Sequence, residues 1–167
     1  MILTADSGST KCHWALVEGK GAGDDAKIIE TRGINPVTCS SEQVKGIIAG
    51  GLLPQINTAE VEGIYFYGAG CIANAPATLE LQRTLQEIFS QATTIVVATD
   101  MLGAAHALCG HDKGIVCILG TGSNSAFYDG EQLAKNVPPL GYILGDEGGG
   151  ANNSSIYYQR FIDLDIS

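Results

Sequence analysis

Residues 2–17 read ILTADSGSTKCHWALV, which is an apolar run, a short Gly/Ser/Thr turn and a second apolar run. The same order returns at residues 116–131, where the turn is Gly120-Thr121-Gly122-Ser123-Asn124-Ser125. Each stretch predicts a β-hairpin whose tip offers glycine-exposed backbone N–H groups and short hydroxyls, which suit the binding of a phosphate. Two such tips in one chain indicate that the phosphates of a nucleotide are held from two sides.

The composition is that of a globular protein with an acidic surface. Of the 167 residues, 45% are hydrophobic, and the mean hydropathy is +0.14. A chain of this length can bury a substantial core in one or two domains. Eighteen acidic residues against nine basic ones give a net charge of −9, which argues against binding to nucleic acid or to an anionic membrane surface.

The cysteines and the apolar segments favour a cytoplasmic protein. The five cysteines are an odd number without Cys-x-x-Cys spacing, and most lie in apolar runs, as reduced core thiols do. No segment approaches the ~18 apolar residues of a membrane span, and the first residues lack the basic and apolar regions of a secretion signal. We therefore expect neither a membrane nor a nucleic acid as partner.

Hydrophobic periodicity predicts an α/β lobe and then the start of a second one. In the first part, the expected strands are 2–6, 12–18, 27–32, 61–68 and 94–99, and the expected helices are 40–53, 75–90 and 100–109. Three antiparallel strands followed by alternating helices and strands place a meander beside a parallel extension, which gives a five-stranded mixed sheet flanked by helices. The order then restarts with expected strands at 114–119, 125–129 and 132–136.

This order divides the chain into three expected parts. Residues 1–112 form the first lobe, 113–150 begin the second, and 151–167 are a linker and tail. A second full lobe would need about as many residues as the first, so we expect the second lobe to be incomplete. The Gly/Asn/Ser run at 148–155 predicts a flexible linker.

The element order and several short motifs resemble the actin-like ATPase superfamily, whose lobes have the ribonuclease-H-like fold. Besides the two turns, the matching motifs are Gly33-Ile34-Asn35-Pro36, Tyr67-Gly68-Ala69-Gly70-Cys71, Thr99-Asp100 and Gly141-Tyr142-Ile143-Leu144-Gly145-Asp146-Glu147-Gly148. Within that superfamily, residues 1–150 are similar to the N-acetylglucosamine kinases. They are similar as well to the related ATPases that activate 2-hydroxyacyl-CoA dehydratases and benzoyl-CoA reductases.

The resemblance implies an ATP-dependent sugar kinase that uses Mg²⁺, and it assigns roles to particular residues. The implied phosphate contacts are Gly8, Ser9, Thr10, Lys11, Gly120, Thr121 and Gly122. The implied sugar contacts are Asn35, Ser123, Asn124, Pro139, Leu140, Gly141 and Asp146. Asp6 would hold Mg²⁺ through water, and Asp100 would be the general base that takes a proton from the attacking sugar hydroxyl.

Four of these residues also have a plain structural interpretation. Asp6 ends an apolar strand, where a carboxylate is costly unless used, but it could bond its own turn. Asp100 opens a predicted helix as its N-cap, where the helix dipole would keep it ionised, as a base must be. Asn35 precedes Pro36 and projects its amide from a loop, although turn chemistry alone explains the pair. Asp146 lies in a glycine-flanked loop that could simply be solvated.

Three functions stay open from the sequence. The leading one is phosphorylation of N-acetylglucosamine or a related amino sugar, with the sugar and the nucleotide as partners. An activator-type ATPase would need two iron–sulfur cysteines after the second turn, and no cysteine follows Cys117. A non-catalytic single lobe is the third, because the residues expected to bind adenosine are largely missing; such a chain would retain weak ligand binding and little kinase activity. The oligomeric state is open, a homodimer included.

Overall fold

The computed structural model describes residues 1–18, 26–120, 122–137, 146 and 148–150. The chain divides into two compact units, Met1–Gly103 and Ala104–Ser167. The predicted site residues Thr121, Pro139, Leu140 and Gly141 lie outside the described residues, as does the predicted tail at 151–167. The boundary expected at 112/113 stays a prediction.

Unit 1 is built on a mixed five-stranded sheet with the strand order β3-β2-β1-β4-β5. Its strands are β1 (Ile2–Ser7), β2 (Lys11–Val17), β3 (Lys27–Arg32), β4 (Gly63–Gly68) and β5 (Thr94–Thr99). The first three strands form an antiparallel meander, and β4 and β5 run parallel to β1. The predicted α/β fold with a five-stranded mixed sheet is confirmed.

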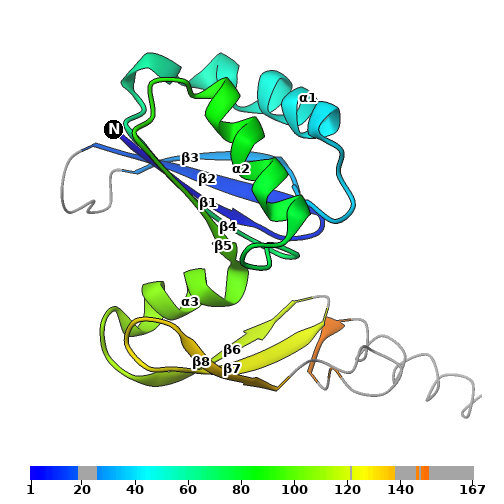
Figure 1. Cartoon of the computed structure of the whole chain (residues 1–167), viewed down its shortest axis with the longest axis vertical. Coiled ribbons are helices and arrows are strands. Elements are labelled where there is room, and N and C mark those ends of the chain that lie inside the picture. The colour runs from blue at the N-terminus through cyan, green and yellow to red at the C-terminus, as the bar shows by residue number, and fades with distance from the viewer. Residues whose placement is uncertain (19–25, 121, 138–145, 147, 151–167) are drawn as a thin grey trace, which may run out of the picture. The chain divides into compact units, whose positions relative to one another are not determined.

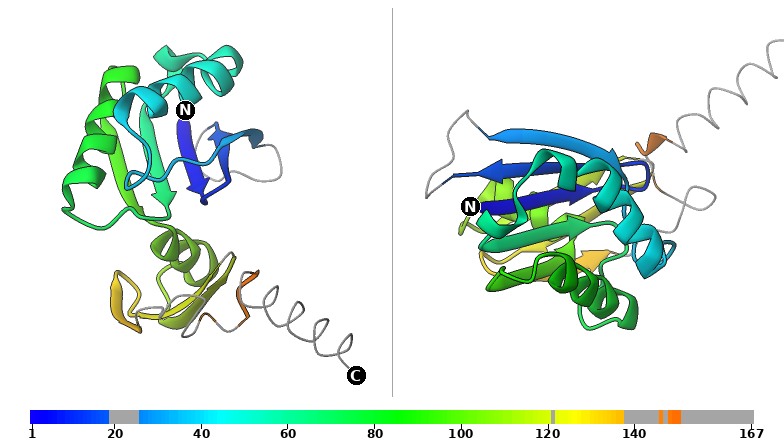
Figure 2. Two further views of the ribbon diagram at one scale, coloured as in Figure 1. Left: turned by 90° about the vertical axis from the view of Figure 1, so that its right-hand side faces the viewer. Right: turned by 90° about the horizontal axis from the view of Figure 1, so that it is seen from above.

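Two helices, α1 (Ser41–Gly51) and α2 (Pro76–Ile88), cover one face of this sheet (Figures 1 and 2). A capping box starts α1, because the Ser40 hydroxyl accepts the Gln43 N–H and the Gln43 side chain accepts the Ser40 N–H. The helix ends before the predicted residue 53, since Pro54 lies in the following 3-10 helix η1 (Leu53–Gln55). A second 3-10 helix, η2 (Thr58–Glu60), precedes β4, which begins at Gly63 rather than at the expected residue 61.

The core of unit 1 fills the space between these helices and the sheet. Its buried members include Leu3, Ala5, Trp14, Phe66, Val44, Ile48, Leu81 and Leu85. Trp14 is completely buried, and its Nε1 donates to Thr31 Oγ1 at 2.9 Å, so the indole N–H keeps a partner inside the core. The prediction that the single tryptophan is a core residue is confirmed.

Unit 2 contains a three-stranded antiparallel sheet in the order β6-β7-β8. Its strands are β6 (Gly114–Leu119), β7 (Ser123–Tyr128) and β8 (Leu133–Val137), and they follow helix α3 (Asp100–Cys109), whose last residues belong to this unit. The Tyr128 hydroxyl lies 3.0 Å from the Gly110 carbonyl oxygen and 2.9 Å from that of Gly130. Because β7 begins two residues before the predicted 125, Ser123 and Asn124 are strand residues. Among the described helices, none is both long and apolar enough to cross a membrane.

The β1–β2 turn rests on the connector that follows β3. The Gly33 N–H donates to the Thr10 carbonyl oxygen at 2.9 Å. A Cβ added to Gly33 would overlap the Gly8 carbonyl oxygen and lie 2.9 Å from the Ser9 carbonyl carbon. The buried Ser7 hydroxyl accepts the Ile34 N–H at 2.8 Å and donates to the Ile34 carbonyl oxygen at 3.0 Å. The turn and the connector therefore form one rigid local structure.

Replacing Gly33 by alanine tests this contact. We expect Gly33→Ala to lower the free energy of unfolding by about 1–3 kcal/mol, because the new methyl group meets backbone atoms that cannot move independently. The matched control is Gly46→Ala in α1, where a Cβ has nothing within 4 Å and alanine should add about 0.5–1 kcal/mol of stability. Urea unfolding measures both, and equal effects of the two substitutions would contradict the contact.

Candidate functional site

The carboxyl ends of β1, β4 and β5 meet at one edge of the unit 1 sheet, because these strands are parallel. Asp6 is the penultimate residue of β1 and is exposed, and half-buried Asp100 follows β5 directly. Their charges interact, since Asp6 contributes to raising the pKa of Asp100. Asp6, the predicted metal ligand, and Asp100, the predicted general base, therefore lie near each other.

Asp100 differs from its predicted role as the N-cap. It is the first residue of α3, and the side chain that caps the helix is Thr99, whose hydroxyl accepts the Leu102 N–H at 3.2 Å. The Asp100 carboxylate accepts the Met101 N–H at 2.8 Å instead. Burial raises the pKa of Asp100 above its ordinary value, the Met101 N–H lowers it, and the charge of Asp6 raises it again. The expectation that the helix terminus chiefly stabilises the ionised form is therefore corrected, because burial has the larger effect.

The first glycine turn offers donors that no other described residue uses. The Gly8 N–H donates to the Lys11 carbonyl oxygen at 2.9 Å, which closes the turn. Ser9 and Thr10 are exposed, and within the described part of the chain no acceptor takes their backbone N–H or hydroxyl groups. Successive unpaired N–H groups in a turn form a concave site for an anion.

The Lys11 ammonium group forms an ion pair with Glu30. Its Nζ lies 3.0 Å from Glu30 Oε1 and 3.1 Å from Glu30 Oε2, on the neighbouring strand β3. His13 faces the same carboxylate at 3.3 Å. Of the four residues expected to contact phosphate in this turn, Lys11 is thus engaged in an exposed ion pair, which a phosphate group would have to replace.

Asn35 lies in the connector after Gly33, and its amide oxygen has a structural use. Asn35 Oδ1 accepts the Val37 N–H at 2.9 Å, and a Cβ on Gly70 would overlap this oxygen. Gly70, in the loop after β4, has a φ of +81°, a backbone conformation that favours glycine. Because glycine has no Cβ, the Asn35 amide can lie against this loop. The Asn35 side chain therefore has the turn-forming role that the Asn-Pro pair alone would explain. Its amide NH₂ has no acceptor among the described residues.

Cys71 belongs to the same loop and is buried beside Gly68. Burial, together with the nearby charge of Asp100, raises the pKa of the Cys71 thiol to about 12. At neutral pH the side chain is therefore a neutral thiol rather than a nucleophile. We assign it to packing beneath the sheet edge.

In unit 2, the second glycine turn packs against the segment that contains Asp146. The Gly150 N–H donates to the Gly120 carbonyl oxygen at 2.8 Å, and the Gly149 N–H donates to the Asp146 carbonyl oxygen at 2.9 Å. A Cβ on Gly122 would lie 2.7 Å from Asp146 Oδ2. Residues far apart in the sequence, the predicted phosphate turn and the predicted sugar ligand, are thus in direct contact.

Two predicted sugar ligands in this unit carry buried oxygen atoms without a hydrogen-bond partner among the described residues, namely Asp146 Oδ1 and Asn124 Oδ1. Asp146 also has a φ of +62°, which non-glycine residues seldom adopt. An unpaired buried acceptor costs roughly 1–3 kcal/mol, more for a charged group. Hydroxyl groups of a bound sugar are donors that would satisfy such acceptors. Ser123 is the third predicted sugar ligand in the described part of unit 2, and it pairs with Leu119 across the hairpin.

The sequence interpretation missed several supporting residues. Gly148–Gly150 were expected to begin a flexible linker, but Gly149 is buried and both Gly149 and Gly150 bond to the Asp146 segment and the turn, so this expectation is wrong for those residues. Ser7, Gly33 and Thr99 were given no role of their own, although Gly33 and Thr99 lie within matching motifs. A glycine directly after the third strand of a lobe is the signal that could have identified Gly33.

Asp6 has the chemistry of a magnesium ligand. In the part of the chain that the structure describes, no three His, Cys, Asp or Glu side chains converge on a point where they could hold a metal alone. Mg²⁺ does not need such a cage, because it is held by one or two carboxylates together with substrate phosphates and water. An exposed carboxylate beside the unpaired donors of Ser9 and Thr10 fits that requirement.

Comparison with solved structures decides the fold family. This chain is 42% identical to the "Putative N-acetylglucosamine Kinase" of Porphyromonas gingivalis, with a TM-score of 0.89 over 99% of its residues. The fold is that of the actin-like sugar kinases. The neighbour thus confirms the resemblance to N-acetylglucosamine kinases that the motifs indicated. The chain spans 57% of the length of that protein.

Two more distant structures share the fold alone. One is the "Putative N-acetylglucosamine Kinase" of Chromobacterium violaceum, at 22% identity and a TM-score of 0.54, with 90% of this chain and 52% of that chain covered. The other is the ROK hexokinase of Thermus thermophilus, at 15% identity and a TM-score of 0.56, with 95% of this chain and 64% of that chain covered. No protein-family profile matches the chain, and no curated protein matches it.

The raised pKa of Asp100 makes stability depend on pH. A carboxyl whose pKa is higher in the folded than in the unfolded protein contributes stability below its ordinary value of 3.8 and loses it as pH rises through the folded value. We therefore expect Asp100→Asn to be more stable than the wild type at neutral pH, with the difference shrinking as the pH falls toward 3.8.

Urea unfolding across this pH range measures the difference. A companion variant, Asp6→Asn, should lower the pKa of Asp100 toward its ordinary value, as followed by carboxyl carbon NMR. A constant loss of stability in Asp100→Asn at every pH would instead assign the carboxylate to holding the Met101 N–H.

Proposed function

We propose that this chain carries the phosphate-binding and sugar-binding residues of an ATP-dependent kinase that phosphorylates N-acetylglucosamine or a related amino sugar. The observation that carries the proposal is the 42% identity over 99% of the chain to the Porphyromonas protein, whose name describes that activity. Among the described residues, the donors of the first turn and the buried oxygen atoms of Asp146 and Asn124 have no partner. This supports the proposal, because a phosphate group accepts hydrogen bonds and sugar hydroxyls can donate them.

In this proposal, the first turn binds the nucleotide phosphates. The N–H and hydroxyl groups of Ser9 and Thr10 donate to phosphate oxygens, while Gly8 keeps the turn tight. Asp6 holds Mg²⁺, which when bound neutralises the charge that develops on the phosphates. Gly120, Thr121 and Gly122 of the second turn are also proposed to contact phosphate.

Asp100 is proposed as the general base. It removes the proton from the sugar hydroxyl as that oxygen forms its bond to the γ-phosphorus and the bond to the ADP oxygen breaks, so the proton ends on the Asp100 carboxylate. A raised pKa suits this role, since a base works best when its pKa approaches the operating pH. Positioning and charge neutralisation supply most of the remaining catalysis in phosphoryl transfer.

Sugar recognition is proposed for the predicted sugar ligands, each within its own unit. Asp146 accepts from sugar hydroxyls, Asn124 offers its unpaired oxygen, and Asn35 offers its amide NH₂. Ser123, Pro139, Leu140 and Gly141 complete the proposed set. The five free cysteines are compatible with the proposed cytoplasmic location.

Removing the Asp146 carboxylate tests the sugar site. Calorimetry with N-acetylglucosamine should show binding to the wild-type chain that Asp146→Ala weakens about 10–100-fold, because a hydrogen bond to a charged group contributes about 1.5–3 kcal/mol. The matched control is Asp112→Ala, an exposed aspartate in the loop before β6, which should leave the affinity unchanged. Equal weakening in both variants, or no heat of binding in the wild type, would contradict the assignment.

A coupled assay of ADP release complements calorimetry. Because the chain spans 57% of the related kinase, we expect turnover well below the ~1–100 s⁻¹ typical of kinases.

A further inference from the structure

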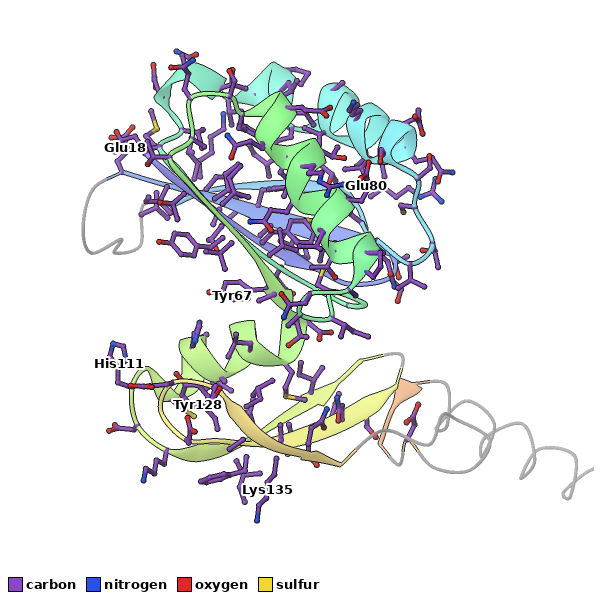
Figure 3. All side chains as sticks on the ribbon, in the orientation of Figure 1. Glu18, Tyr67, Glu80, His111, Tyr128 and Lys135 are labelled. Atoms are coloured by element: carbon purple, nitrogen blue, oxygen red, sulfur yellow. The ribbon has the colours of Figure 1, made fainter. Side chains whose placement is uncertain are left out.

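A row of polar side chains crosses one face of the unit 1 sheet near the first glycine turn. Glu30 of β3 pairs with His13 of β2. His13 pairs in turn with Asp6 of β1, and Asp6 pairs with Tyr67 of β4. Directly opposite residues of neighbouring strands share a face of the sheet. Figure 3 shows Tyr67 on the side of this sheet away from α1 and α2, so the whole row lies on that side.

Lys11 lies on the same face as His13 and two residues nearer to the turn, because residues two apart on a strand point to the same side. The Lys11 Nζ atom is 3.0 Å from Glu30 Oε1 and 3.1 Å from Glu30 Oε2. His13 Nε2 is 3.3 Å from Glu30 Oε2. One carboxylate on β3 therefore binds two neighbouring side chains of β2.

The ion pair between Lys11 and Glu30 competes with any anion that binds at the turn. Lys11 directly follows Thr10, whose backbone N–H and hydroxyl have no acceptor among the described residues. The Lys11 carbonyl oxygen accepts the Gly8 N–H, so the Lys11 backbone is part of the turn, whereas its long side chain can change direction. An ammonium group has three N–H donors, and those that contact Glu30 are not available to a phosphate.

Moving Lys11 from Glu30 to a phosphate has a small energetic cost. The exposed fraction is 60% for the Lys11 side chain and 51% for that of Glu30, and water screens such exposed ion pairs. Glu30 also keeps His13 as a partner, since an imidazole N–H can donate to a carboxylate whether the ring is neutral or charged. The hydrogen bond from Lys11, and to a smaller extent that from His13, lowers the pKa of the Glu30 carboxyl below its ordinary value.

We propose that Glu30 is a positioning residue of the first turn, which holds the Lys11 ammonium group when no ligand is bound and releases it when a polyphosphate binds. His13 stays on the Glu30 carboxylate in both states. The inference rests on the proposed phosphate site and goes beyond it, because Glu30 acts through Lys11 and does not contact the ligand. Glu30 thereby lowers the affinity of the turn for phosphate, since binding has to separate the ion pair.

Calorimetry of the 167-residue chain with inorganic tripolyphosphate and Mg²⁺ tests the proposal. Glu30→Gln should bind tripolyphosphate about 2–5-fold more tightly than the wild type, because an exposed ion pair no longer opposes binding. The matched control is Glu87→Gln on α2. It removes the same charge from another exposed ion pair, that with Lys45, and should leave the affinity unchanged.

A double-mutant cycle shows whether Glu30 acts through Lys11. Lys11→Met should weaken the binding of tripolyphosphate, and in that background Glu30→Gln should no longer change the affinity. Carboxyl carbon NMR supplies a second readout. The Glu30 signal should shift when the wild type is saturated with tripolyphosphate, because Lys11 leaves the carboxylate, and it should stay in place in Lys11→Met.

Two results would overturn the inference and leave the proposed phosphate site intact. In the first, Glu30→Gln binds tripolyphosphate no more tightly than the wild type. In the second, the gain from Glu30→Gln persists undiminished in Lys11→Met, which would show that Glu30 only repels the ligand. A different result, no binding in any variant, Glu30→Gln included, would contradict the phosphate site itself together with the inference that starts from it.

Discussion

The hydroxyl of Ser7 ties the first glycine turn to the connector after β3, and the candidate site of unit 1 depends on this tie. One buried side chain satisfies both the N–H and the carbonyl group of Ile34, while Gly33 beside it leaves room for the backbone of the turn. The turn is thereby held in a form in which Ser9 and Thr10 present donors that no other described residue uses. The same connector continues into Asn35, so the proposed phosphate contacts and the proposed sugar contact share one support.

In unit 2, the glycine turn is supported by the segment that contains Gly149. Its turn at Gly120–Gly122 rests on Gly149, where a Cβ would lie 2.8 Å from the Gly122 carbonyl carbon, much as the first turn rests on Gly33. In each unit, a glycine far along the chain permits backbone to pack on backbone, and the residue that would contact the sugar lies close by in sequence: Asn35 after Gly33 and Asp146 before Gly149. The repeated hairpins and the repeated supports describe one structural plan used twice.

Much of this plan could be predicted from the sequence, because alternation and apolar periodicity report directly on which residues face a core. Strands such as β3 and β5, and the core position of Trp14, follow from that pattern. The close approaches could not be predicted, because Gly33 and Gly149 acquire their roles only when distant backbone meets them. The raised pKa of Asp100 was missed for the same reason, since burial and the neighbouring Asp6 are tertiary effects that outweigh the local helix terminus.

The central claim is that the Ser9 and Thr10 donors of the first glycine turn, which no other described residue uses, bind phosphate, together with the Gly120–Gly122 turn. Titration of the ¹⁵N-labelled chain with inorganic tripolyphosphate and Mg²⁺, followed by amide NMR, tests it most directly. The account predicts saturable shifts that are largest at Ser9 and Thr10 and at the Gly120–Gly122 turn, and that weaken in the Gly33→Ala variant. Shifts confined to other segments, or turn amides that do not respond, would contradict it.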